Sequence, residues 1–370
     1  MKILEIIIGL TSGGAERFVV DLCNQFTKEG HSVTLLTLKD LKYENYGFYL
    51  NDIHKEVRVE SLGLRKFGPT IFFKLFKVIN NKQVDIVHMH LASVPFFCVL
   101  PLIFHRKARY FVTSHNQAES ERGNIRFLIK KILFKFKRFE LIGISDQNST
   151  SLLNVFGKRA IATIYNGREL LKETDKFFEV KKIFDNYRKT GVSNIFVSVC
   201  RCQPQKNIPR LVRCFNKVIS KYPDTLLLII GGGYDNEIGI LAKKSACSGI
   251  IFLGLKHNVV DFFKCADFFT LSSDYEGMPI TLIEALSVGC IPVGTPVSGF
   301  NDIIKDEVNG FVAHDFGDDS YIKAIENAIN NKQKINKDLL ISTYKEKLSI
   351  ESCANSYIKL FELSKYSKQV

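Results

Sequence analysis

Short apolar runs alternate with helical stretches along the whole chain, and this alternation limits the fold more than any other feature. Such alternation is typical of parallel sheets whose strands are joined by helices. The predicted strands are Lys2–Ile8, Val33–Leu38, Asp85–His88, Arg109–Thr113, Leu141–Ile144, Ile161–Ile164, Ile195–Cys200, Thr225–Ile230, Ile250–Leu253, Phe268–Leu271 and Ile291–Val293. A chain of 370 residues suits two such domains. We therefore predict an α/β protein with one domain at 1–167 and a second at 168–349.

The stretch Phe268–Thr295 predicts a strand, a turn and a helix at a sheet edge. The helical pattern begins at Met278 or Pro279, and proline suits the first helical position because it needs no N–H there. Free N–H groups at a helix start, with the helix dipole behind them, suit a phosphate. The groups concerned belong to Met278, Ile280 and Thr281.

Two glutamates, Glu276 in the turn and Glu284 in the helix, frame this phosphate site. Carboxylates accept hydrogen bonds from hydroxyls and are poorly placed to bind the phosphate itself. The pattern therefore favours a sugar nucleotide, with Glu284 on the ribose and Glu276 on the transferred sugar. The alternative is that both are solvated residues that the helix dipole favours.

The run CADFFTLSSDYEGMPITLIEALSVGCIPVGT resembles the donor-site segment of family 4 retaining glycosyltransferases. The match includes both glutamates, Gly277, Pro279 and Ala285. The resemblance implies the GT-B fold, in which two Rossmann-like domains face a cleft and a C-terminal helix crosses back to the first domain. It therefore predicts that the tail, 350–370, packs back on the first domain. It also implies a nucleoside-diphosphate sugar as substrate, with no cofactor.

Two cations follow one predicted strand end, Arg201 and Lys206. A guanidinium and an ammonium together suit a diphosphate, although ordinary surface charge is the alternative. Both match family positions that neutralise the diphosphate, so leaving-group charge would be stabilised without a metal. Cys200 and Cys202 stand where the family usually has Gly and Leu, and Lys256 lies near where the family holds the base.

In the first domain, the loop GLTSGGAE contains Gly13 and Gly14 and opens a helix. In the resembled family this loop faces donor and acceptor, although a tight turn explains the glycines equally well. His115, after a predicted strand, matches a histidine that lies against the transferred sugar there; a solvated loop histidine is the alternative. His88 and His90 could suggest a metal, but no third ligand is evident, so we predict a hydrogen-bonding role and no metal site.

A basic and aromatic helix is predicted over Arg122–Phe139. Its inward face is predicted to consist of Ile125, Leu128, Ile129, Ile132, Leu133 and Phe136. Phe127 and Phe134 are predicted to lie outward among cations that include Lys130 and Lys131, unless a loop covers both phenylalanines. Exposed aromatic and basic residues suit an anionic membrane surface or a lipid-linked phosphate.

The composition narrows the functional classes. A formal charge of +13 favours an anionic partner, and nine scattered cysteines favour reduced thiols in the cytoplasm. The longest apolar segment, Leu91–Phe104, is too short to span a bilayer, and Gly231–Gly233 lacks the lysine of a phosphate-binding ATPase loop.

We therefore predict a retaining, metal-independent glycosyltransferase of surface polysaccharide assembly. It would use a UDP-sugar and a glycan or lipid-linked acceptor, in the cytoplasm at the inner face of the plasma membrane. The alternatives are a sugar-nucleotide epimerase or phosphorylase on the same fold, or a non-catalytic module that binds nucleic acid, a partner we do not expect.

Overall fold

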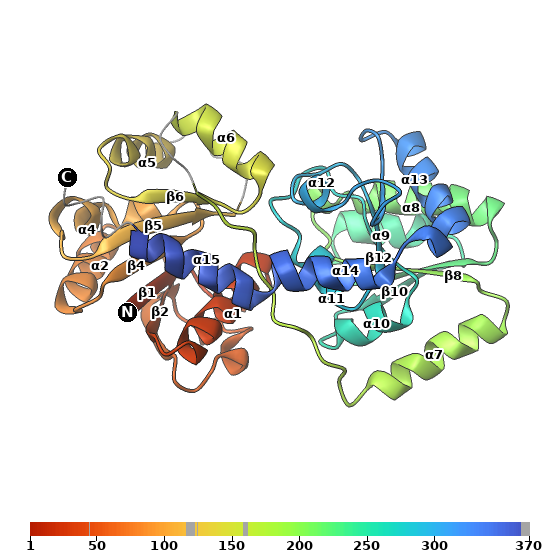
Figure 1. Ribbon diagram of the computed structural model, residues 1–370, viewed down its shortest axis with the longest axis horizontal. Coiled ribbons are helices and arrows are strands. Elements are labelled where there is room, and N and C mark those ends of the chain that lie inside the picture. The colour runs from red at the N-terminus through yellow and green to blue at the C-terminus, as the bar shows by residue number, and fades with distance from the viewer. Residues whose placement is uncertain (44, 116–122, 124, 158–161, 364–370) are drawn as a thin grey trace. The chain divides into compact units, whose positions relative to one another are not determined.

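The computed structural model describes residues 1–43, 45–115, 123, 125–157 and 162–363 (Figure 1). The chain divides into two compact units, Met1–Glu169 with Leu348–Val370, and Leu170–Lys347. Among the described residues, no helix has both the length and the apolar character needed to cross a membrane.

The N-terminal unit is built on a seven-stranded parallel sheet in the order β3-β2-β1-β4-β5-β6-β7. Its strands are β1 (Lys2–Ile7), β2 (Ser32–Lys39), β3 (Arg58–Leu64), β4 (Ile86–His90), β5 (Arg109–Ser114), β6 (Glu140–Gly143) and β7 (Ala162–Thr163). Its helices are α1 (Gly14–Lys28), α2 (Thr70–Asn81), α3 (Val94–Phe97), α4 (Val99–Phe104), α5 (Ile125–Lys135), α6 (Asp146–Phe156) and α15 (Ile350–Leu363). The predicted strand and helix starts at Ile161 and Arg122 lie outside the described residues.

The second unit is built on a six-stranded parallel sheet in the order β10-β9-β8-β11-β12-β13. Its strands are β8 (Asn194–Val199), β9 (Thr225–Ile230), β10 (Ile250–Gly254), β11 (Phe268–Leu271), β12 (Ile291–Gly294) and β13 (Phe311–Val312). Its helices are α7 (Phe177–Lys189), α8 (Ile208–Lys221), α9 (Glu237–Ser245), α10 (Val259–Cys265), α11 (Ile280–Ser287), α12 (Phe300–Ile303), α13 (Asp318–Asn331) and α14 (Lys337–Thr343). The two parallel-sheet units confirm the predicted α/β class.

Strand order reverses once in each sheet, and the reversals show where a ligand would bind. In the first sheet the chain passes outward from β1 to β2 and β3 and then returns to the other side of β1 with β4. In the second sheet β8 and β11 are related in the same way. Ligands of open α/β sheets bind outside the carboxyl ends of the strands at such a reversal. The loops after β8 and β11 are those that carry Lys206 and Glu276.

Helix α15 returns to the N-terminal unit, in which Figure 1 shows it in blue across the strands. At its start Arg168 pairs with Ser349, and Gly167 leaves no room for a side chain, since an added Cβ would lie 2.6 Å from Cys353 Cβ. Tyr357 and Phe361 then pack on the ring of His88. The helix therefore closes one face of the first sheet.

Candidate active site

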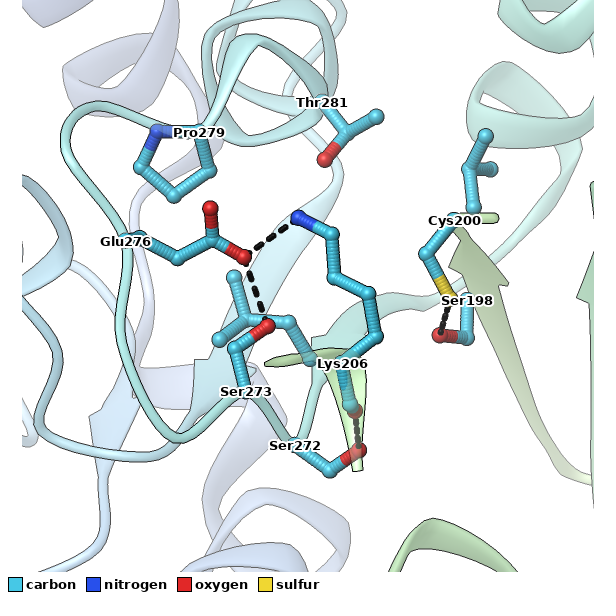
Figure 2. A pocket seen from close by; sticks show the side chains of 10 residues that line it. Ser198, Cys200, Lys206, Ser272, Ser273, Glu276, Pro279 and Thr281 are labelled. Atoms are coloured by element: carbon cyan, nitrogen blue, oxygen red, sulfur yellow. Dashed lines mark hydrogen bonds and ion pairs between the residues drawn. The ribbon is translucent and has the colours of Figure 1, made fainter. Parts of the chain in front are cut away.

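A pocket lies where β8 and β11 end side by side (Figure 2). Its walls come from both strand ends and from the start of α11. The lining residues are Ser198, Val199, Cys200, Lys206, Leu271, Ser272, Ser273, Glu276, Pro279 and Thr281. The pocket thus occupies the reversal point of the second sheet, at the position that the strand order indicates.

Lys206 and Glu276 meet in this pocket as an ion pair, which Figure 2 shows between two loops. Ser273 Oγ donates to Glu276 Oε1 at 2.6 Å, and Gln205 Nε2 donates to Oε2 at 3.2 Å. The carboxylate is therefore held by donors on both oxygens. Oε1 already accepts from Lys206 and Ser273, whereas Oε2 accepts only from Gln205 and keeps a lone pair for a hydroxyl. An ammonium has three N–H donors, so Lys206 can bind a phosphate while it remains paired with Glu276.

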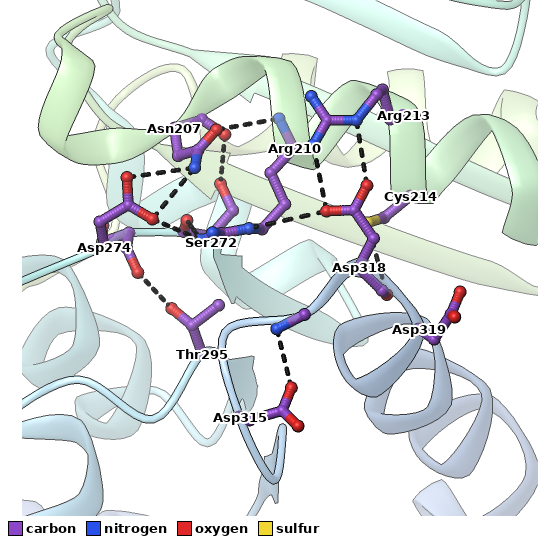
Figure 3. A network of polar contacts seen from close by, with 12 residues as sticks. Asn207, Arg210, Arg213, Cys214, Ser272, Asp274, Thr295, Asp315, Asp318 and Asp319 are labelled. Atoms are coloured by element: carbon purple, nitrogen blue, oxygen red, sulfur yellow. Dashed lines mark hydrogen bonds and ion pairs between the residues drawn. The ribbon is translucent and has the colours of Figure 1, made fainter.

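A second network fixes the two loops to each other (Figure 3). Asn207 has a left-handed backbone with φ of 45°, caps α8 by accepting from the Arg210 N–H at 3.1 Å, and donates to both carboxylate oxygens of Asp274. Arg210 Nη1 donates to Asp274 Oδ1 at 2.7 Å and to the carbonyl of Ser272 at 3.1 Å. Ser272 Oγ in turn donates to the Lys206 carbonyl at 2.9 Å. The pocket walls are thus tied together through charge-assisted hydrogen bonds between the buried Arg210 and the exposed Asp274.

Arg210 was missed by the sequence reasoning, although the sequence holds a signal for it. A cation in the first turn of a helix is disfavoured by the dipole, so it needs a nearby carboxylate. Asp274 and Asp318 supply that charge, the second at 3.8 Å from Arg210 Nε.

Helix α11 begins at Ile280, with Pro279 as its N-cap residue, slightly later than the predicted start. The N–H of Leu282 donates to the carbonyl of Pro279 at 3.1 Å, so the groups of Ile280 and Thr281 precede the first turn of helical hydrogen bonds. The Thr281 side chain also lines the pocket. The helix start therefore meets the geometric requirement for an anion site.

The turn before α11 is shaped by contact with Gly299. This glycine has a φ of 72°, and an added Cβ would lie 2.4 Å from the Gly277 carbonyl and 2.7 Å from Met278 Cα. Close approach of this kind requires glycine, because a side chain would push the turn away. The segment after β12 therefore supports the predicted phosphate loop through this close backbone contact.

The predicted donor-site residues Glu284, Arg201 and Lys256 lie outside the pocket lining. Glu284 is buried within α11, one turn after Thr281. Arg201 lies two residues after the end of β8 and is exposed, and its guanidinium has no hydrogen bond or ion pair to the described part of the chain. Lys256 is exposed after β10, the edge strand on the far side of β9. Their donor-binding roles remain predictions.

The predicted residues of the N-terminal unit lie at strand ends near that sheet's own reversal point. Gly13 is the N-cap residue of α1, Gly14 its first residue, and Glu16 turns back to accept from the Thr11 hydroxyl at 2.8 Å. His115 directly follows β5. Glu5 of β1 lies within hydrogen-bond distance of both His88 and His90. It is the third possible metal ligand that the sequence reasoning did not find.

The predicted orientation of α5 is wrong for most of its residues, although Leu133 and Ile129 do pack inward as predicted. Phe134 is only 2% exposed, and Phe127 packs on Phe156 of α6 with ring centroids 5.6 Å apart. Lys130 is also buried, with its ammonium 5.3 Å from the centre of the Phe156 ring, whereas Lys131 is exposed as predicted. The cause is that α5 carries two apolar stripes, and the one with the larger aromatic rings packs inward.

The other stripe of α5, predicted to face the sheet, is the one that solvent reaches. Its side chains are 46 to 64% exposed, and exposed cations flank them. The apolar residues are Ile125, Leu128, Ile132 and, just after the helix, Phe136. The cations are Arg126, Lys131 and Lys135.

Two family models match the chain in succession. Residues 12–170 match Glycosyltransferase Family 4, and residues 179–346 match Glycosyl transferases group 1. The two matches meet near the division between the two units and together span most of the sequence.

Similar proteins of known or assigned activity support the same family. The chain is 24% identical over 368 residues to a Campylobacter jejuni GalNAc-alpha-(1->4)-GalNAc-alpha-(1->3)-diNAcBac-PP-undecaprenol alpha-1,4-N-acetyl-D-galactosaminyltransferase, covering 94% of this chain and 96% of that one. It is 25% identical over 283 residues to an Escherichia coli UDP-Gal:alpha-D-GlcNAc-diphosphoundecaprenol alpha-1,3-galactosyltransferase, covering 70% of each. The crystal structure of Anabaena HepE in complex with UDP has the same fold, with a TM-score of 0.80 at 16% identity over 98% of this chain and 100% of that one.

Proposed function

Since the chain belongs to the family 4 glycosyltransferases and has their GT-B fold, we propose that it transfers a sugar from a UDP-sugar to a glycan or lipid-linked acceptor. The acceptor would belong to surface polysaccharide assembly. The observation that carries the proposal is the pocket at the β8/β11 reversal, in which a lysine, a hydrogen-bonded carboxylate and a helix start come together. The relatives that use UDP-Gal or undecaprenol-linked acceptors support the choice of donor and acceptor class.

The chemistry of the pocket suits departure of a nucleoside diphosphate. As the glycosidic bond breaks, negative charge develops on the β-phosphate, and Lys206, Arg201 and the start of α11 would stabilise it. These groups can provide the stabilisation without a metal ion, so we propose metal-independent turnover. We also propose retention by front-face attack, in which the departing phosphate takes the proton of the acceptor hydroxyl.

Nucleotide binding and release test the proposed function. Thermal unfolding should shift upward with UDP more than with GDP or ADP, because a ligand that binds only the folded state stabilises it. UDP release from the matching UDP-sugar should then depend on an acceptor, and it should persist in EDTA. Stabilisation by none of the nucleotides would contradict the proposal, and sugar conversion without net UDP release would favour an epimerase.

The exposed stripe of α5 favours an anionic membrane as a further partner. Apolar side chains on one helix face, with Arg126, Lys131 and Lys135 beside them, match an interfacial helix that lies on negatively charged lipid. This location would bring the enzyme to a lipid-linked acceptor. The proposed contact uses the face opposite to Phe127 and Phe134, which are packed inside the unit.

Changing both Leu128 and Ile132 to serine should weaken binding to anionic vesicles by about tenfold or more, since each loses a large apolar side chain. Co-sedimentation with phosphatidylglycerol-containing vesicles measures this, with pure phosphatidylcholine vesicles for comparison. Leu241→Ser is the matched control, because Leu241 is similarly exposed but lies on α9 of the second unit. Equal sedimentation of the double variant and the control would contradict the membrane contact.

A further inference from the structure

A chain of buried polar side chains crosses the face of the first sheet beneath α1 and α15. Glu5 of β1 lies beside His88 of β4 in the strand register, and His90 lies beside Thr113 of β5. All four side chains have no exposed surface. Phe18 of α1 and Tyr357 of α15 pack against the histidine rings and cover them. Water therefore cannot hydrogen-bond to these side chains. Each proton must lie in a hydrogen bond between two members of the buried chain.

The hydrogen-bond partners determine where each proton lies. Glu5 Oε2 is 2.6 Å from His90 Nε2 and 3.0 Å from His88 Nδ1, and a carboxylate accepts from both. The two histidines together lower the pKa of the Glu5 carboxyl to about 2 against the opposing effect of burial, so it is ionised. His90 is neutral, because burial lowers its pKa to about 4. A neutral ring that donates from Nε2 carries no proton on Nδ1.

The protonation of His90 determines that of His115, because His115 Nε2 lies 3.2 Å from His90 Nδ1. Because His90 Nδ1 has no proton, His115 Nε2 must donate this hydrogen bond. Burial, followed by the neighbouring histidines, holds the pKa of His115 well below its usual value, so this ring is neutral as well. Its remaining nitrogen, Nδ1, therefore has a free lone pair, and it has no hydrogen-bond partner among the described residues.

We propose that Glu5 acts through His90 to hold His115 in the Nε2–H form, so that His115 Nδ1 accepts a hydrogen bond from a hydroxyl of the substrate. The substrate contact rests on the proposed glycosyltransferase function, whereas the proton arrangement does not. His115 then binds a hydroxyl as an acceptor, and Glu5 and His90 are positioning residues. With a neutral ring of low basicity, His115 does not compete with the departing phosphate for the acceptor proton.

The position of the proton can be measured directly in the substrate-free enzyme. Histidine-selective ¹⁵N labelling and two-dimensional NMR should show a slowly exchanging imidazole proton bonded to His115 Nε2, with scalar coupling across the hydrogen bond to His90 Nδ1. A His115→Phe sample assigns the signal. A proton bonded to His90 Nδ1 instead would overturn the proposal whether or not the protein transfers sugar.

Metal content is a second decisive measurement, because the donor atoms of Glu5, His88 and His90 all lie within 4.8 Å of one another. An ion on His90 Nε2 would move its proton to Nδ1 and reverse the hydrogen bond to His115. Elemental analysis of the purified enzyme should therefore find no stoichiometric transition metal. A stoichiometric ion would overturn the proposal.

Kinetics test whether His90 works through His115. His90→Phe keeps an aromatic ring and should lower kcat/KM for the nucleotide sugar about tenfold, as expected when one oriented hydrogen bond is lost. In a His115→Phe background the same change should have no further effect, since a residue that acts only through His115 is not additive with it. Independent, multiplying losses would overturn the proposal.

Tyr357→Phe is the matched control for disruption of the buried chain. It removes the hydroxyl that lies 2.9 Å from Thr113 Oγ1, at the other end of the chain from His115. The His115 Nε2 proton and kcat/KM should both remain unchanged. Loss of the proton signal in this variant would mean that packing, and not the Glu5–His90 pair, fixes the ring, and would overturn the proposal.

Discussion

Replacing Lys206 with alanine is expected to lower kcat by about 100-fold or more, the usual cost of losing a group that stabilises transition-state charge. The ammonium is the cation that lines the pocket, and charge on the departing phosphate grows only as the bond breaks. The loss should therefore fall mainly on kcat and less on KM. Initial rates of UDP release over a range of UDP-sugar concentrations measure both constants.

The structure adds a second reason for a large effect at this position. Lys206 is the counter-charge of the largely buried Glu276, so its removal leaves a carboxylate whose remaining donors are Ser273 and Gln205. Lys217→Ala is the control, because Lys217 is an exposed lysine of α8 whose contact with Asp319 lies at the surface. Arg201→Ala should reduce turnover similarly. If both the Lys206 and Arg201 variants turn over at the wild-type rate, the proposed charge stabilisation is wrong.

Replacing Glu284 with alanine should weaken UDP binding by about 1.5 to 3 kcal/mol, the range for a lost hydrogen bond to a charged group. This corresponds to roughly a 10- to 150-fold rise in Kd, which calorimetry resolves. If Glu284 binds the ribose, wild-type protein should prefer UDP to 2′-deoxy-UDP, and the variant should bind both nucleotides equally weakly.

Glu237→Ala provides the comparison for Glu284, because Glu237 is an exposed carboxylate in the first turn of α9. It represents a residue that the helix dipole alone favours at such a position. If the Glu284 and Glu237 variants bind UDP with equal affinity, Glu284 does not bind the ribose. Thermal unfolding without nucleotide separates lost binding from lost stability.

The sequence correctly predicts those strands whose apolar pattern agrees with their buried environment. Phe268–Leu271 and Thr225–Ile230 were predicted with the bounds that the structure has, because both are central strands buried along their whole length. β3 was missed, since an edge strand that buries only Leu64 has no apolar run. The Lys206 loop was found because two cations follow one predicted strand, and the Glu276 loop because two glutamates frame a predicted helix start.

The remaining features depend on tertiary pairing, which local sequence does not contain. α5 has two apolar stripes, and only the presence of Phe156 decides that Phe127 and Phe134 pack inward. Glu5 is a carboxylate within an apolar strand, a signal that a buried partner is needed. Its partners could not be named, because the pairing of β1 with β4 joins positions 83 residues apart.

The return of α15 determines when during synthesis the N-terminal unit can be completed. The hydrogen bond between Thr113 and Tyr357 spans 244 residues, and all of Leu170–Lys347 is translated between them. Until α15 emerges from the ribosome, His88 lacks the rings of Tyr357 and Phe361 that pack on it, and the sheet lacks one of its covering helices. The first unit to be translated is therefore the last to become fully native, and the second unit, Leu170–Lys347, can fold before it.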